Sequence, residues 1–169
     1  ISSIEKALGN NKKIIRSMPN TAVSVRKSLT CICSNETGKD YLDLCVSIFN
    51  SIGKTIIIDE SKMQSATVMC ASGIAFWMRI IRAMAQGGVE LGFEAKDSLE
   101  ISYRTAEGAI NLLKTNESHP EEEIDKVTTP SGCTIKGIIE MENKGLSSAI
   151  IHGLISSHEK INKIKWKIL

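Results

Sequence analysis

The sequence lacks any long uninterrupted hydrophobic run. The longest apolar stretches, Thr55–Ile58 and Ala75–Met78, are far shorter than the roughly 20 residues that cross a bilayer, and Arg79 and Arg82 follow the second one closely. We therefore expect no membrane span and no membrane partner. The first residues, from Ile1 onward, also show no charged-then-apolar pattern of a secretory signal.

An excess of charge of one sign is also missing. The formal net charge is +2, and the lysines are spread over several segments. Recognition of nucleic acid depends on a concentrated basic surface, so we expect no nucleic-acid partner. The one basic concentration, Lys160–Lys167, is interpreted as a frayed chain end in which Trp166 packs nearby.

Cysteine pairs with metal-site spacing are absent as well. No two of the five cysteines have CxxC spacing, and no histidine lies close enough to complete a site, so no metal is expected. An odd number of cysteines among apolar neighbours is typical of core packing in the reducing cytoplasm, where we expect the protein to reside. Cys31, Cys33, Cys45 and Cys70 are interpreted in this way, and Cys133 is the exception because it lies in a predicted binding segment. His119, His152 and His158 are interpreted as surface or capping residues.

Strand signals are confined to the first 60 residues. There the patterns predict a helix, two strands, a helix and a third strand. So few strands do not close a doubly wound sheet, and no Gly-rich GxGxxG turn joins a strand to a helix. We therefore expect residues 1–60 to be the C-terminal portion of a Rossmann-like α/β domain whose earlier strands lie upstream. The predicted elements span residues 3–8, 13–18, 28–33, 41–49 and 54–59.

The remaining residues, 61–169, carry helical patterns alone. The longest predicted helix runs from Lys62 to about Leu91, with an interruption expected at Ser72–Gly73, and it is apolar on more than one face. A second copy of the chain, packed about a two-fold axis, is expected to cover it; burial within one chain is the alternative. The expected fold class is α+β, mainly α, with an all-helical dimerisation domain. Further helices are predicted over residues 95–115, 132–142 and 146–160.

The segment Val127–Thr134, sequence VTTPSGCT, carries the clearest binding signal. It places hydroxyl side chains, a proline and a glycine immediately before a helical pattern. The free N–H groups and positive dipole end of a helix that starts near Ser131 or Gly132 would bind an anion such as a carboxylate. A plain helix cap provided by this string is the alternative interpretation.

Three segments together match a known pattern. They are Arg16–Ala22 (RSMPNTA), Cys70–Phe76 (CASGIAF) and Val127–Gly137 (VTTPSGCTIKG). The chain resembles the Δ1-pyrroline-5-carboxylate reductase family, whose Met-Pro-Asn-Thr segment follows a late strand of the dinucleotide-binding domain. The family's Thr-Thr-Pro-Gly-Gly-x-Thr signature lies in its helical domain. The order of the motifs agrees, and the resemblance covers nearly the whole chain.

The resemblance implies the reduction of pyrroline-5-carboxylate to L-proline by NADPH or NADH, in a homodimer or a larger assembly of dimers. It implies that the signature loop holds the substrate carboxylate, and that the Thr134 hydroxyl, as the catalytic group, also reaches the ring nitrogen. The turn at Met18, Pro19 and Asn20 would border the nicotinamide. The implied substrate-binding residues are Thr129, Ser131, Gly132, Cys133 and Thr134, with Cys133 supplying backbone rather than thiolate.

The chain also departs from the family pattern. Ser131 stands at the first of two usual glycines, Ile74 stands where proline is usual, and Glu123 stands where leucine is common. Glu121–Glu123 is otherwise interpreted as a solvated first helical turn. A non-catalytic dimerisation or ligand-binding module of the same fold is therefore the alternative function.

Overall fold

The computed structural model describes residues 1–163, so Trp166 and the end of the predicted basic stretch lie outside the described residues. The chain forms two compact units, one of Ile1–Ala75 with the chain from Gly153 onward, and one of Phe76–His152. The elements are α1 (Ser2–Leu8), β1 (Ile15–Met18), β2 (Ser28–Ser34), α2 (Leu42–Asn50), β3 (Gly53–Ile57), α3 (Met63–Ala66), α4 (Gly73–Glu90), α5 (Ala95–Asn116), α6 (Pro120–Val127), α7 (Cys133–Asn143) and α8 (Leu146–Asn162).

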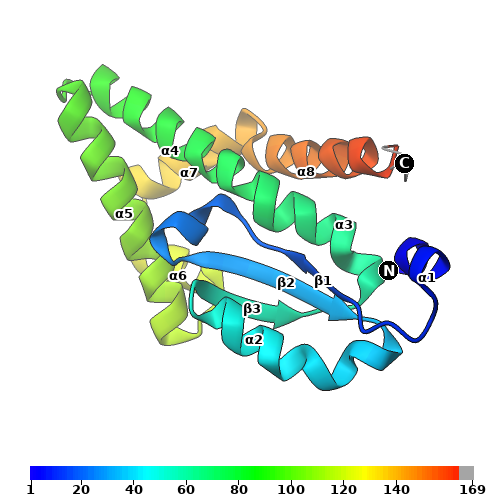
Figure 1. The fold of residues 1–169 in the computed structure, drawn as a ribbon. Helices are drawn as coiled ribbons and strands as arrows, with labels where there is room; N and C mark the ends of the chain where they lie inside the picture. Colours follow the sequence, from blue (N-terminus) through cyan, green and yellow to red (C-terminus); the bar gives the residue numbers. More distant parts are fainter. Residues whose placement is uncertain (164–169) are drawn as a thin grey trace. The chain divides into compact units, whose positions relative to one another are not determined.

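The first unit contains a three-stranded sheet in the order β1-β2-β3 (Figure 1). β1 pairs antiparallel with β2, and β2 pairs parallel with β3. All three predicted strands are therefore confirmed, with ends that shift by one or two residues. Because β2, α2 and β3 follow one another and the two strands are parallel, they form a βαβ unit.

The core of this unit lies against the central strand. Successive side chains of a strand point to opposite faces, and β2 is buried on both of its faces. Cys31 and Cys33 pack with Met63 and Ala66 of α3 in one apolar cluster. Ile32, which is fully buried, faces the opposite side. This double burial explains why β2 reads as a near-continuous run of apolar and small residues.

The long helical stretch changes its winding rather than breaking. Between α3 and α4, residues Thr67–Ser72 form a π-helical segment, and it ends at the position where the sequence predicts an interruption. A π-helical turn accommodates an extra residue within a helix and shifts the backbone hydrogen bonds from the i–4 to the i–5 carbonyl. The segment therefore places Cys70 and its carbonyl group in an irregular part of the helix.

The second unit is all-helical, as predicted. At the approach of α4 to α5 the buried Ser98 hydroxyl donates to the Ala85 carbonyl at 2.6 Å. A Cβ atom added at Gly88 would lie 2.1 Å from Ser98 Oγ and 3.1 Å from Ser98 Cβ. Gly88 is therefore required by the close approach of the two helices and not by its backbone angles.

Glu123 joins the end of α5 to α6. Its Oε1 accepts hydrogen bonds from Lys126 Nζ at 2.7 Å, Ser118 Oγ at 2.6 Å and Asn116 Nδ2 at 3.1 Å. These bonds, Lys126 first, lower the pKa of Glu123 to about 2. The expectation of a solvated turn is thus wrong for Glu123, whose side chain is 15% exposed. His119 caps α6, as predicted, by accepting from the Glu121 N–H at its Nδ1.

Large apolar side chains are exposed along α4. Trp77 and Met84 on α4 and Leu91, the residue directly after α4, follow one another at seven-residue spacing and are 60%, 56% and 82% exposed. The helical stretch Glu60–Glu90 is long and apolar enough to cross a membrane by length and composition alone. Its most apolar 18-residue window has a mean hydropathy of 1.4, and 17% of that window is buried. The sequence-based expectation of no membrane span is therefore left as a prediction. An apolar surface of this size needs a covering partner.

Candidate functional site

The segment before α7 forms a tight turn. The Gly132 N–H donates to the Thr129 carbonyl at 2.9 Å, and Ser131 has a φ of 59°. Proline at the second position and a positive φ at the third are typical of a type II turn, in which glycine is preferred at the third position. The family's usual glycine at position 131 therefore matches the backbone conformation, and Ser131 is held in the left-handed region.

The helix that follows starts without a side-chain cap. α7 begins at Cys133 with Gly132 as its N-cap residue, and no side chain of the described residues caps it. The alternative interpretation of this string as a plain helix cap is not supported by a side-chain hydrogen bond, because Ser131 lies one residue before the N-cap position and in a left-handed conformation. The Gly132 N–H is engaged in the turn, so the N–H groups of Cys133 and Thr134 are the first that a ligand can reach.

Gly132 has no room for a side chain. A Cβ atom there would lie 2.5 Å from Thr129 Oγ1 and 3.0 Å from the Thr129 carbonyl oxygen. The Thr129 side chain thus packs directly against the start of α7, which fixes the turn. Thr129, Cys133 and Thr134 are exposed.

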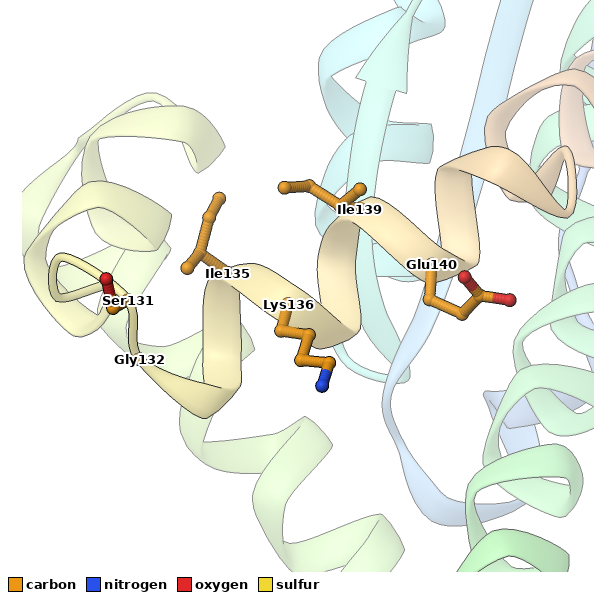
Figure 2. Close-up of a pocket in the computed structure, with 6 residues that line it drawn as sticks. All are labelled: Ser131, Gly132, Ile135, Lys136, Ile139 and Glu140. Atoms are coloured by element: carbon orange, nitrogen blue, oxygen red, sulfur yellow. The ribbon is translucent and has the colours of Figure 1, made fainter.

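An open pocket of about 560 Å³ borders this turn and the first two turns of α7 (Figure 2). Ile135 and Ile139 point to one side of the helix, and Lys136 points away from them. Of the five predicted substrate-binding residues, Ser131 and Gly132 line the pocket. Thr129 lies in the turn before α7, and Cys133 and Thr134 are the first two residues of α7, but none of these three lines the pocket. The pocket combines an apolar wall with a helix start, an arrangement that suits a small apolar ring carrying an anionic group.

The other predicted site residues lie in the first unit, at the end of β1. Asn20 caps a short 3-10 helix, Thr21–Val25, by accepting from the Ala22 N–H at 3.1 Å. Its Nδ2 donates to the Cys70 carbonyl at 3.2 Å. The structure therefore joins two of the three sequence motifs through one amide, a contact that the sequence alone did not predict. Among the described residues, no partner uses the second N–H or the second acceptor position of the Asn20 amide.

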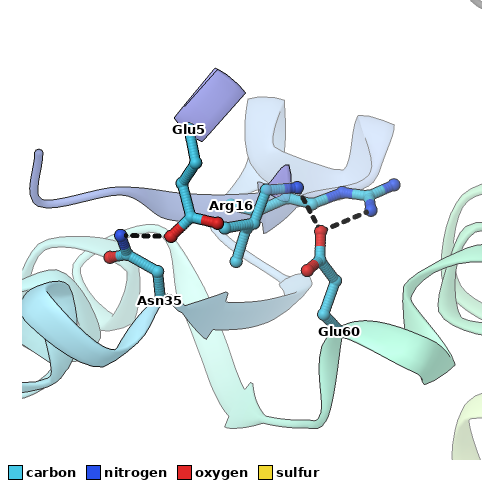
Figure 3. Close-up of polar contacts among 5 residues, drawn as sticks. Glu5, Arg16, Asn35 and Glu60 are labelled. Carbon is cyan, nitrogen blue, oxygen red and sulfur yellow. Dashed lines mark hydrogen bonds and ion pairs between the residues drawn. The ribbon is translucent and has the colours of Figure 1, made fainter. Parts of the chain in front are cut away.

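The βα turn after β2 does not suit a dinucleotide. It contains a single glycine, Gly38, and a Cβ atom there would lie 2.9 Å from both Asn35 Oδ1 and the Ile14 carbonyl oxygen. Asn35 instead accepts from the Ile14 N–H at 3.0 Å and donates to Glu5 Oε1 at 2.9 Å (Figure 3). This turn anchors the N-terminal segment, so no phosphate cradle is formed by the described residues.

Arg16, in the first motif, has a structural partner. Its Nη1 lies 3.5 Å from Glu60 Oε1, which the Ile1 nitrogen also contacts (Figure 3). Both side chains are more than a third exposed, so the pair contributes little to stability, about 0–1 kcal/mol. Arg16 therefore links β1 to the segment that leads into α3.

The fold and the loop define a class of protein, in which part of an α/β sheet is joined to a helical unit containing a helix start without a side-chain cap. A family model for pyrroline-5-carboxylate reductase dimerisation matches residues 60–164. The chain therefore belongs to the pyrroline-5-carboxylate reductase family, as its motifs predict. The predicted domain boundary near residue 60 stays a prediction, since the two compact units divide the chain elsewhere.

Individual relatives agree with the family model. The chain is 44% identical to pyrroline-5-carboxylate reductase 1 of Dictyostelium discoideum, covering 95% of this chain and 31% of the relative. It is 45% identical to reductase 2 of that organism, covering 89% and 54%, and 33% identical to the Methanosarcina acetivorans reductase, covering 99% and 62%. The chain thus spans about a third to three fifths of the length of these relatives.

Solved structures support the same fold. The Coxiella burnetii pyrroline-5-carboxylate reductase superposes with a TM-score of 0.91 at 28% identity, covering 97% of this chain and 62% of that one. The Plasmodium falciparum pyrroline carboxylate reductase with NADP bound gives 0.86 at 27% identity, covering 95% and 65%. The predicted combination of a partial Rossmann-like sheet and a helical domain is confirmed.

Proposed function

We propose that the protein to which this chain belongs reduces Δ1-pyrroline-5-carboxylate to L-proline with NADPH or NADH. The observation that carries the proposal is the start of α7, where a tight turn precedes a helix without a side-chain cap. A substrate carboxylate placed there would accept hydrogen bonds from the N–H groups of Cys133 and Thr134. The positive end of the helix dipole would stabilise its charge.

Thr134 is proposed as the catalytic residue. Its hydroxyl donates a hydrogen bond to the ring nitrogen while the carboxylate is bound by the loop. When the C=N bond is reduced at its carbon, the electron pair of that bond moves to the nitrogen, which takes a proton. A hydrogen-bond donor at the nitrogen favours the iminium-like form of the C=N bond, which accepts hydride more readily. Ile135 and Ile139 supply the apolar wall for the ring.

The nicotinamide cofactor supplies the hydride when bound. The described residues fit its nicotinamide end in part, because the Asn20 amide keeps one donor and one acceptor position available to a carboxamide. They do not fit its diphosphate, because the βα turn at Gly38 is filled by its own chain. We therefore assign Met18, Pro19 and Asn20 to the nicotinamide and assign no described residue to the phosphates.

The exposed stripe on α4 supports a homodimer. Trp77, Met84 and Leu91 lie within the region that matches the family's dimerisation model, and a second copy would remove their side chains from water. The same association would account for the apolar exposure of Glu60–Glu90 without a membrane. A larger assembly of dimers and a cytoplasmic location remain predictions.

A non-catalytic module of the same fold is the second candidate function. It is favoured by Ser131, whose Cβ lies in the turn where the family usually has glycine, in a backbone conformation that glycine prefers. Such a module would bind L-proline or pyrroline-5-carboxylate at the loop without oxidising NAD(P)H. Calorimetric titration with L-proline, together with a turnover assay, separates the two functions.

Replacing Thr134 by Val tests the proposal in the full-length protein. The change keeps the shape and removes the donor, so we expect kcat to fall on the order of 100-fold with little change in stability. Thr128→Val is the matched control, because the Thr128 hydroxyl binds the Asp125 carbonyl at 3.2 Å at the end of α6. Measurement of NADPH oxidation with pyrroline-5-carboxylate decides: equal rates for the two variants would remove Thr134 from the reaction.

A further inference from the structure

Two thiols meet at the core of the first unit. Cys31 Sγ on β2 lies 3.6 Å from Cys70 Sγ in the π-helical segment. Cys31 is 5% exposed, and Cys70 is half-buried. The sulfurs are in contact but not bonded, since a disulfide requires about 2.0 Å. Among the described cysteines this pair brings together one residue from the sheet and one from the helix that covers it.

We propose that Cys31 and Cys70 form an oxidisable dithiol that closes to a disulfide on exposure to a peroxide. The Cys70 thiolate attacks one peroxide oxygen, giving a sulfenic acid and releasing one water after protonation. The Cys31 sulfur then attacks the Cys70 sulfur, and the departing hydroxyl takes the Cys31 proton as the second water. Two thiols lose two electrons in total, and one hydrogen peroxide is reduced to two waters.

Exposure decides the order of the two steps. Cys70 is the sulfur that a dissolved oxidant reaches first, since Cys31 is enclosed between β2 and α3. Burial, and then the contact with Cys70, raises the pKa of Cys31 to about 11. The Cys31 thiol therefore stays protonated and unreactive toward solvent oxidants until Cys70 has become an electrophile. Cys31 is the resolving residue and Cys70 the sensing residue.

Oxidation would change the hydrogen bonds of the turn that follows β1. The Cys70 carbonyl accepts from Asn20 Nδ2 at 3.2 Å, and Asn20 Oδ1 holds the Ala22 N–H at 3.1 Å. Closing the sulfurs from 3.6 Å to about 2.0 Å moves the π-helical segment relative to β2. Because the Asn20 amide joins both sides, the same movement changes the hydrogen bonds of this turn.

The first experiment treats the purified protein with hydrogen peroxide, blocks free thiols with N-ethylmaleimide and maps peptides by mass spectrometry. We expect a mass lower by about 2 Da before blocking, from the two hydrogens lost, and a peptide pair joined through Cys31 and Cys70. Dithiothreitol should restore the original mass and separate the linked peptides. The Cys70→Ser variant should form no such linked peptides. Cys45→Ser, which removes a half-buried cysteine on α2, should leave it unchanged. Oxidation confined to Cys133, or a bridge between other cysteines, overturns the proposal.

The second experiment follows hydrogen exchange of the Ala22 amide in the reduced and the oxidised protein. If the disulfide changes the hydrogen bonds of the Asn20 turn, we expect the exchange rate of this amide to change at least threefold. This ratio corresponds to a change on the order of 0.6 kcal/mol in the free energy of local opening. An unchanged rate in protein with the confirmed bridge would show that oxidation does not reach the turn. Neither experiment uses turnover, so both results are independent of the proposed reductase activity.

Discussion

Ser131 is the residue whose side chain conflicts most with its backbone. Its φ of 59° places it in the left-handed region, which costs a non-glycine residue about 1 kcal/mol. We predict that Ser131→Gly raises the free energy of unfolding by up to about 1 kcal/mol, because glycine adopts this backbone conformation without strain. We also predict a lower KM for the substrate, because the Ser131 Cβ no longer narrows the approach to the pocket. Urea unfolding and initial rates measure the two effects.

The same replacement elsewhere provides the control. Ser156 is exposed in the middle of α8, where replacing serine by glycine lowers helix stability by about 0.5 kcal/mol. Ser156→Gly should therefore change the free energy of unfolding in the opposite direction. If both replacements destabilise the protein equally, Ser131 is not strained.

Glu123 gives the protein a defined response to acid. Its pKa is lowered to about 2 by hydrogen bonds from Lys126, Ser118 and Asn116, from an ordinary value of 4.5. The stabilisation is thus complete above pH 4.5 and is lost as the pH falls toward 2. We predict that Glu123→Gln flattens the decrease in thermal stability over this range. Glu121→Gln, in the same helical turn, should keep the wild-type slope; a flat slope for both variants would contradict the prediction.

Residue types predicted where the helix after Val127–Gly132 starts better than they predicted the conformation of the turn before it. The string Thr-Pro-Ser-Gly correctly indicated a helix start, because proline and glycine restrict the backbone there. The positive φ of Ser131 could not be predicted from the residue type, because it is set by the turn, in which glycine is preferred at this position. The Asn20 contact with Cys70 was beyond prediction, because it joins residues that are 50 positions apart.

Among the elements, the crossing of α4 and α5 depends on one glycine. An added methyl at Gly88 would meet the Ser98 side chain, which is fixed by its hydrogen bond to Ala85. We predict that Gly88→Ala lowers the free energy of unfolding by about 1–3 kcal/mol through overpacking. Differential scanning calorimetry should show a lower Tm.

Replacement of the neighbouring Gly87 distinguishes the effect of packing on stability from the effect of helix propensity. A Cβ atom at Gly87 meets nothing within 4 Å in the chain, so Gly87→Ala should raise stability by up to about 1 kcal/mol. A loss of stability in both variants would place the cause elsewhere in α4. Opposite signs at adjacent positions would establish the close approach at Gly88.

Secondary structure was predicted well where the hydrophobic pattern was strong. The three strands and the helices lie within a few residues of their predicted ranges, since the near-continuous run of apolar and small residues in β2 and the helical spacing of apolar residues elsewhere are clear patterns. The π-helical form of Thr67–Ser72 could not be predicted, because it arises from a shift of backbone hydrogen bonds that any of several residues would tolerate.

For the whole molecule, self-association is the property that the exposed stripe on α4 predicts. We expect Met84→Glu to weaken the dimer by at least about tenfold, because a charge would be desolvated at the centre of the stripe. Leu44→Glu is the control: Leu44 is 57% exposed on α2 and lies outside residues 60–164. Sedimentation velocity distinguishes them, and a wild-type monomer, or two equally dimeric variants, would contradict the prediction.

The start of α7 also bears on folding. A helix is costly to nucleate, and its first turn is the part most easily melted. Because no described side chain completes that turn, a bound carboxylate would act as the missing cap, so that ligand binding and helix nucleation become one event. Part of the binding free energy would then be used to order Cys133–Ile135, and even a simple anion that occupies the position would raise the melting temperature of this segment.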